Sequence, residues 1–524
     1  MTVSPTPGSS TDPISTDVKL GDTDHGRLRL LAEQLTGGID PLLQGSLDMR
    51  SILEVTSEFY ALERWLAHVP PGIFVCGAAR LQKNHLTTGE LNEDWRLTSA
   101  VGNLLAQRDV SCFTGGGPGS MAAASEGAAN AGGTVVGICI KLKHEEEPNP
   151  HMTHQIKLKY FFPRKCGLVR KTAGAVITPG GMGTLDEAFE CVTFANELAR
   201  TGEIYPVAFV GDMYKPLEHW LRHDPNGPVK RGYMADLPEY VKFFTDEKEA
   251  TEFVLEKGKN RLERLRSRAL VAQKEEPMDQ NEELAMAILG GLFDEAHSQS
   301  SSVIMDPRMV FRSAKDYVEV LKNMRSIDRS STALIVGGEP ASFSHTQDPN
   351  LDIAARVGYA LKALNQNIII GAPLGFPGQV ADTIGKYHSI VTQFDLNDLD
   401  RMPSTLLTKG TSHSVDYGFT QRTASLNGSS GAIVFPGGIR TLDLLCELWN
   451  LKMCHKISDD YKFSLVDKAF WSGFISFLDN LATQEGARRR KGDVEHLGYM
   501  DKDEVALPLI TDNASEAVNY ISKR

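Results

Sequence analysis

The sequence has no long apolar run and no paired-cysteine motif. A membrane-spanning helix needs about 20 consecutive apolar residues, and no run in this 524-residue chain approaches that length. The seven cysteines form no CxxC pair, and several lie in apolar runs, which is typical of buried, reduced thiols. These features predict a cytoplasmic protein that makes no membrane contact.

The chain also lacks an excess of positive charge. Its 55 Lys and Arg residues against 67 Asp and Glu residues give a formal net charge of −12, which argues against nucleic acid as a partner. The one basic cluster, residues 488–491, could hold a phosphate but is interpreted as a solvated loop. His151 and His154 have no convincing third ligand nearby, so we predict no metal and no cofactor.

The N-terminus has neither the basic nor the apolar region of a secretory signal. Residues 1–25 are rich in Ser, Thr, Pro, Gly and Asp, and we predict a disordered tail. The remaining chain is too long for one ordinary hydrophobic core, so two or more domains are expected.

Short apolar runs alternate with helical patterns in the first half of the chain. We expect strands at 73–76, 110–113, 134–140, 175–177 and 205–210, with a helix at about 93–108 and others between the later strands. This alternation predicts an α/β fold, a Rossmann-like and mostly parallel sheet flanked by helices. Glycine-rich turns follow several of these strands, at the carboxyl ends where open α/β sheets bind ligands.

The most informative stretch is PGGMGTLDE at residues 179–187, which joins an apolar run to a helical pattern. A glycine turn at a helix N-terminus presents free N–H groups and the positive end of the helix dipole, which suits a phosphate. We expect substrate binding by Gly180, Gly181, Met182, Gly183 and Thr184. An earlier turn would line the facing wall of the site with Gly116, Gly117, Gly119 and Ser120.

The second half of the chain repeats the plan of the first. The stretch PGGIRTLD begins at Pro436, 257 positions after Pro179, and Gly498-Tyr499-Met500 matches Gly232-Tyr233-Met234. We therefore predict two tandem copies of one domain, at 26–257 and 308–524, joined by a helical connector at 258–307.

Three motifs of the first copy together resemble the LOG (Lonely Guy) family, whose members have often been labelled lysine decarboxylases. The motifs are GGGPGSM at 115–121, FFPRK at 161–165 and PGGMGTLDE at 179–187, and the resemblance covers nearly all of this copy. It implies hydrolysis of the N-glycosidic bond of nucleoside 5′-monophosphates, such as AMP or cytokinin nucleotides. The products would be the free base and ribose 5-phosphate.

The resemblance also implies residue roles. Glu187 matches the catalytic glutamate of the family, and Arg164 matches its catalytic arginine. A carboxylate beside the ribose can stabilise oxocarbenium-like charge or activate water, and the arginine can hold the phosphate or assist departure of the base. Lys165 is placed in the substrate site, and Asp186 is expected to contact the ribose or cap the helix.

The second copy lacks these groups. With the 257-residue offset, Glu187 corresponds to Leu444, and Arg164 corresponds to Gln421. A leucine cannot do acid–base work, so we expect the second copy to be catalytically silent. Single-domain LOG proteins are dimers with active sites near the subunit interface. The second copy is therefore expected to replace the second subunit in an intramolecular pseudo-dimer, with a further homo-oligomer left open.

Two alternatives to a nucleosidase remain open. The chain could be a nucleotide-binding or sensing protein without turnover, although retention of Arg164 and Glu187 favours an enzyme. A true lysine decarboxylase usually needs a lysine-bound pyridoxal cofactor, and the sequence offers no distinct site for one.

Overall fold

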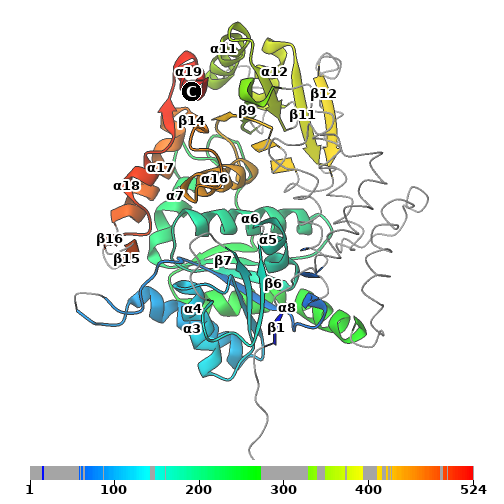
Figure 1. Ribbon diagram of the computed structural model, residues 1–524, viewed down its shortest axis with the longest axis vertical. Helices are drawn as coiled ribbons and strands as arrows, with labels where there is room; N and C mark the ends of the chain where they lie inside the picture. Colours follow the sequence, from blue (N-terminus) through cyan, green and yellow to red (C-terminus); the bar gives the residue numbers. More distant parts are fainter. Residues whose placement is uncertain are drawn as a thin grey trace, which may run out of the picture.

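The computed structural model describes residues 14–16, 58, 61–62, 65–85, 88–141, 148–159, 161–272, 328–338, 348–371, 374–392, 410–415, 421–422, 425–426, 428–483, 488–491 and 494–522. These residues form two large parallel sheets, each flanked by helices (Figure 1). The predicted α/β fold class is confirmed. Most of the helical connector expected at 258–307 lies outside the described residues.

The first sheet has the strand order β1-β5-β4-β3-β2-β6-β7-β8. Its strands are β1 (Ile14–Thr16), β2 (Gly72–Cys76), β3 (Ser111–Thr114), β4 (Val135–Ile140), β5 (His154–Leu158), β6 (Thr172–Ile177), β7 (Val207–Val210) and β8 (Val241–Phe244). The flanking helices are α3 (Glu93–Gln107), α4 (Ser120–Asn130), α5 (Phe161–Arg170), α6 (Met182–Ala199), α7 (Lys215–Arg222) and α8 (Glu247–Ala272). Strands β2, β3 and β6 are buried throughout, which explains why their apolar runs could be recognised.

Two expectations about the ends of this domain need correction. Within the segment expected to be disordered, β1 pairs in parallel with β5, because the edge of the sheet offers unpaired backbone groups to an extended segment. Helix α8 runs across the expected domain boundary at residue 257. Its later turns belong to the first domain, since Arg261 Nε donates to the carbonyl of Thr172 over 2.9 Å.

The second sheet has the order β12-β11-β10-β9-β13-β14-β17. Its strands are β9 (Thr332–Val336), β10 (Asn367–Ile370), β11 (Tyr387–Thr392), β12 (Gly410–Val415), β13 (Gly431–Val434), β14 (Lys462–Val466) and β17 (Leu509–Thr511). The helices are α11 (Pro349–Ala363), α12 (Gly375–Ile384), α16 (Ile439–Met453), α17 (Lys468–Thr483), α18 (Lys502–Val505) and α19 (Ala514–Ser522). The basic segment Arg488–Lys491, expected to be a loop, is strand β15 of a hairpin with β16 (Val494–Leu497).

The two sheets share one topology once β1 is set aside. In each, the first strand of the repeat lies at the centre, the next three strands follow on one side, and the remaining three lie on the other. The central registers also correspond, since Cys76 pairs with Ile177 and Val336 pairs with Val434. The shared topology agrees with the sequence repeat, whose origin by duplication stays a prediction.

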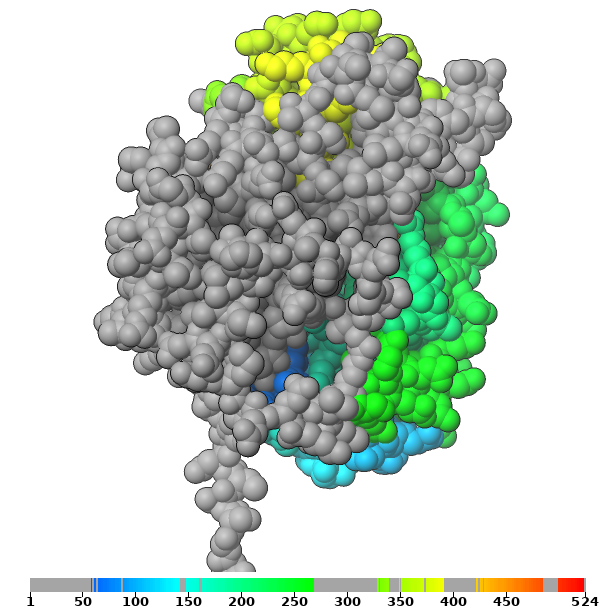
Figure 2. Space-filling model, turned by 90° about the vertical axis from the view of Figure 1, so that its right-hand side faces the viewer, coloured from blue at the N-terminus to red at the C-terminus, as the bar shows by residue number. Residues whose placement is uncertain are grey.

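The two domains pack against each other through equivalent helices. Helix α6 of the first contacts α16 of the second, and α7 contacts α17. Figure 1 shows α6 and α16 between the two sheets, and in Figure 2 the α3–α4 segments (light blue and cyan) lie at the opposite end from α11–α12 (yellow-green). Trp220 of α7 inserts into this interface, where its indole N–H donates to the carbonyl of Phe470 over 3.0 Å. None of the helices in the described part of the chain is both long and apolar enough to span a bilayer.

Candidate active site

The site of the first domain lies where the strand order reverses. The chain runs from β2 outward to β5 and then returns to β6 on the other side of β2. Ligands bind at such a switch point in open α/β sheets, beyond the carboxyl ends of the strands. The turns that follow β2, β3 and β6 meet there, because Ala78 N–H donates to the carbonyl of Pro179 and Ser120 N–H donates to the carbonyl of Ala78.

Glycine is required at several points of these turns. Gly116 and Gly119 have φ values of +71° and +68°, in the left-handed region that favours glycine. A Cβ at Gly180 would lie 2.0 Å from Thr184 Oγ1. Helices α4 and α6 begin directly after Gly119 and Gly181, and neither N-cap residue makes a side-chain capping bond. The N–H of Ser120 already donates to Ala78, and the next N–H groups at the two helix starts form the kind of terminus that binds an anion.

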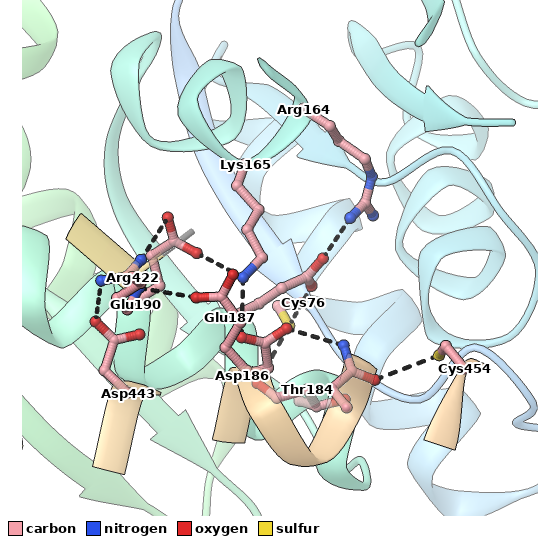
Figure 3. Close-up of polar contacts among 12 residues, drawn as sticks. Cys76, Arg164, Lys165, Thr184, Asp186, Glu187, Glu190, Arg422, Asp443 and Cys454 are labelled. Carbon is pink, nitrogen blue, oxygen red and sulfur yellow. Dashed lines mark hydrogen bonds and ion pairs between the residues drawn. The ribbon is translucent and has the colours of Figure 1, made fainter. Parts of the chain in front are cut away.

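The structure brings Arg164 and Glu187 together, as Figure 3 shows. Arg164 Nη1 of α5 lies 2.7 Å from Glu187 Oε1 of α6, and Arg164 Nε donates to the carbonyl of Ile138 over 3.0 Å. The Arg164 side chain is 7% exposed and that of Glu187 is 17% exposed. The carboxylate is thus accessible from one side and held by a buried cation on another.

A third residue, which the sequence did not single out, completes this arrangement. The thiol of Cys76, at the end of β2, donates to Glu187 Oε2 over 2.9 Å (Figure 3). Both carboxylate oxygens of Glu187 therefore accept a bond from the protein. The available sequence signal was the place of Cys76, directly before the Gly77 turn of the central strand.

Lys165 and Asp186 lie elsewhere than expected. Lys165 Nζ lies 2.9 Å from Asp186 Oδ1 and 3.0 Å from Glu190 Oε2. The other carboxylate oxygen of Asp186 accepts a hydrogen bond from Asn450 Nδ2 of the second domain over 2.8 Å. The Asp186 side chain is 3% exposed. The expected contacts of these two residues with substrate are corrected accordingly: adjacent positions on a helix point about 100° apart, and Asp186 faces the domain interface.

The second domain contributes an equivalent set of charges to this interface. Arg422 Nη1 lies 2.6 Å from Asp443 Oδ2, and its Nε lies 2.8 Å from Glu447 Oε2. Arg422 Nη2 also lies 3.7 Å from Glu190 Oε1, so the two sets meet. We call the six residues the interface cluster: Lys165, Asp186, Glu190, Arg422, Asp443 and Glu447.

Burial changes the protonation of the interface cluster. It raises the pKa of Asp186 to about 6 and the pKa of Asp443 to about 7, despite the nearby cations. Burial alone would also raise the pKa of Glu447, but Lys165 and Arg422 hold that pKa below its ordinary value. The carboxyl groups of Asp186 and Asp443 therefore lose their protons close to neutral pH.

Two aromatic rings pack beside the equivalent glycine turn of the second domain. Phe376 and Phe435 are fully buried, with ring centroids 5.4 Å apart, and a Cβ at Gly337 would lie 2.8 Å from Phe435 Cβ. Phe435 stands at the position of Thr178 in the 257-residue offset. Gln421 Nε2 donates to the carbonyl of Ile390 over 2.6 Å, as Arg164 Nε donates to that of Ile138. The structure thus supports the residue correspondence predicted from the sequence.

Each domain also covers the glycine turn of the other. A Cβ at Gly181 would lie 2.5 Å from the carbonyl oxygen of Tyr499, and one at Gly438 would lie 3.0 Å from that of Tyr233. The Tyr499 hydroxyl donates to Asp94 across the interface. The matching Gly-Tyr-Met segments are therefore reciprocal interface elements.

The remaining predicted residues line the turns or the start of α6. Met182 and Thr184 are buried in the first turn of α6, and a Cβ at Gly183 would be in ordinary contact with Asn450 Oδ1 at 3.4 Å. The carbonyl of Gly117 accepts from Asn149 Nδ2 over 3.1 Å. Among the described residues, no group of three or more His, Cys, Asp or Glu is arranged to hold a metal ion.

Comparison with known families bears on this domain. Residues 121–252, which carry α5, α6 and the PGGMGTLDE turn, match the family described as "Possible lysine decarboxylase". This match lies within the first domain and agrees with the resemblance to the LOG family, whose members often carry that label. It ends at residue 252, within α8.

Relatives of the chain include the pyrimidine/purine nucleotide 5′-monophosphate nucleosidase of Escherichia coli (strain K12), 25% identical over 169 residues. The match covers 30% of this chain and 37% of that enzyme, so the chain spans just over a third of the relative's length. One similar solved structure is the molybdenum cofactor binding protein of Rippkaea orientalis, with 21% identity over 36% of this chain and 97% of that chain and a TM-score of 0.27. Another is the Moco carrier protein of Chlamydomonas reinhardtii, with 18% identity over 38% of this chain and 98% of that chain and a TM-score of 0.25.

Proposed function

We propose that the first domain hydrolyses the N-glycosidic bond of nucleoside 5′-monophosphates, giving the free base and ribose 5-phosphate. The observation that carries this proposal is the Arg164–Glu187 pair, held at 2.7 Å beside two glycine turns at helix N-termini. The E. coli relative, a nucleotide 5′-monophosphate nucleosidase by name, supports the same class of reaction.

In the proposed reaction the N-termini of α4 and α6 bind the 5′-phosphate. Glu187 then faces the ribose. Each carboxylate oxygen can accept about two hydrogen bonds, so the one bond that each receives here leaves capacity for a ribose hydroxyl or the attacking water. As the bond to the base breaks, the carboxylate stabilises positive charge on the sugar, and Arg164 holds the carboxylate in place or assists the leaving base.

We further propose that the second domain is catalytically silent and completes a pseudo-dimer. This domain carries Leu444 and Gln421 in place of the glutamate and arginine, and the rings of Phe376 and Phe435 pack beside its glycine turn. The interface cluster and the reciprocal tyrosines support a partnership of the two domains. Lys165 and Asp186 are assigned to this interface.

The experiment is base release from AMP, GMP, CMP and UMP, measured by chromatography for the full chain and for Glu187→Gln. We expect the wild type to release base, and the variant to lose at least about a thousandfold in kcat, because glutamine carries no charge for the sugar cation. Glu256→Gln, which changes an exposed carboxylate on α8, is the control and should match the wild type.

Three outcomes separate the alternatives. A wild type that binds nucleotides but releases neither base nor ribose 5-phosphate would establish the binding or sensing function instead. Normal turnover by Glu187→Gln would refute the role of this carboxylate. Comparison of the four nucleotides gives the base preference.

A further inference from the structure

We propose that Cys76 is a positioning residue for Glu187, whose thiol fixes the carboxylate in its working orientation. This inference rests on the proposed hydrolysis and assigns it a further residue. Cys76 does not contact substrate in this proposal. It acts only through the hydrogen bond to Glu187.

The geometry gives Cys76 the means to orient the carboxylate. Its Sγ lies 2.9 Å from Glu187 Oε2 and 3.8 Å from the carbonyl oxygen of Thr184, so the thiol contacts two successive parts of α6. Cys76 ends β2, the strand between β3 and β6 at the centre of the sheet. Because Arg164 binds the other carboxylate oxygen from α5, Glu187 is held from two separate elements.

The protonation of Cys76 fits this role and excludes another. Burial, and then the charge of Glu187, raise the pKa of the Cys76 thiol well above 9. The thiol therefore keeps its proton at neutral pH and can only donate to the carboxylate. A nucleophilic cysteine needs an accessible thiolate, whereas Cys76 is 1% exposed. Other ionisable groups that interact with this thiol are Arg164, Cys191 and Tyr214.

The second domain supplies an internal comparison. Val336 ends β9 as Cys76 ends β2, and the two have equivalent partners across the sheet. Where the glutamate is replaced by Leu444 and the arginine by Gln421, the thiol is replaced by a side chain that cannot donate. Buried Val packs as well as Cys at the end of a central strand. The thiol is thus present in the domain that has a carboxylate to accept its hydrogen bond, and absent from the domain that has none.

The test measures kcat and KM for base release from AMP with the full chain and its Cys76→Ser, Cys76→Ala and Cys76→Val variants. A hydrogen bond to a charged group, once lost, lowers kcat by about tenfold or more if it is needed in the transition state. We expect this loss for Ala and Val with KM little changed, and we expect Ser, which keeps a donor, to stay within about threefold of the wild type. Cys112→Ala removes a buried thiol on the neighbouring strand β3 and should leave kcat unchanged.

The outcomes are distinct. An active wild type with unaffected Ala and Val variants overturns the role of Cys76 alone, and so does a Ser variant as poor as the Ala variant. An equal loss in Cys112→Ala also overturns it, since the effect would then follow from thiol burial rather than from the bond to Glu187. A wild type that releases no base overturns the proposed function and this inference together. Thermal unfolding of each variant identifies any loss of folded protein, and the Ser variant, nearest in size to Cys, keeps the comparison possible if Ala or Val fails to fold.

Discussion

The interface cluster gives a quantitative prediction through Arg422. This guanidinium is buried and faces Asp443, Glu447 and Glu190, at 2.6, 2.8 and 3.7 Å. Arg422→Met keeps most of the aliphatic stem but leaves the carboxylates with Lys165 as the remaining cation of the interface cluster. Removing one partner of a buried ion pair costs about 3–5 kcal/mol, because it leaves an uncompensated buried charge. We expect a loss of this size in the free energy of unfolding at about pH 8.

The pH dependence follows from the two raised pKa values. Because the pKa of Asp186 is about 6 and that of Asp443 about 7 in the folded protein, both above the value in an unfolded chain, their protonated forms are favoured by folding. Their contribution to stability is complete below about pH 4 and is lost as the pH rises through 6 and 7. The wild type should therefore be less stable at about pH 8 than at about pH 5, as far as this cluster is concerned.

In Arg422→Met the carboxylates lose a cation, so protonation becomes still more favourable. The deficit relative to the wild type should be small at about pH 5 and reach its full value at about pH 8. The assay is urea unfolding followed by tryptophan fluorescence at several pH values. Arg356→Met is the control, because Arg356 is 68% exposed in its pair with Asp352 and should contribute no more than about 1 kcal/mol. Equal losses in the two variants, or a deficit that does not grow with pH, would refute the reasoning.

Two further predictions concern the site and the interface. Arg164→Gln introduces the residue found in the second domain and should lower kcat/KM for base release by about a hundredfold or more, since glutamine can still reach Ile138 but brings no charge to Glu187. The control is Arg108→Gln, at an exposed ion pair with Glu252, which should behave as the wild type. A similar loss in the control would contradict the role assigned to Arg164. Gly473→Val should lower the free energy of unfolding by about 1–3 kcal/mol or more, because a Cβ at this position would lie 2.4 Å from Trp220 Cδ1 of the other domain; an unchanged urea midpoint would show that the interface does not support the fold.

The sequence was most informative where side chains are buried or where glycine is required. Apolar runs predicted β2 and β3 to within one residue at each end and the end of β6, which begins three residues earlier than expected; the glycine turns marked the site. Strands β5 and β8 went unpredicted, because β5 has the polar sequence His-Gln-Ile-Lys-Leu and β8 is buried only in part. A strand near the edge of a sheet has a weaker hydrophobic pattern than a central one.

The candidate site shows the same division. The positions of the motifs were enough to predict that Arg164 and Glu187 belong to one site, where the structure places them 2.7 Å apart. The same positions led us to expect that Asp186 contacts the ribose or caps the helix. The direction of Asp186 depends on Asn450, which lies 264 positions along the chain, and no local pattern contains that contact. The role of Cys76 likewise depends on three elements that meet only in the folded domain.

The absence of the glutamate and arginine from the second domain has a consequence for symmetry. In a dimer of identical chains, a substitution that removes such a residue from one site removes it from both, and no complete site remains. Two domains on one chain escape this constraint, because each position of the pair can vary alone. In the present chain the interface positions keep the same chemical type in both domains: Lys165 and Arg422, Asp186 and Asp443, Glu190 and Glu447, Tyr233 and Tyr499. The site positions differ between the domains. Their pairs are Cys76 and Val336, Arg164 and Gln421, Glu187 and Leu444. Under the proposed function, the second domain holds the first in place and carries no working site of its own.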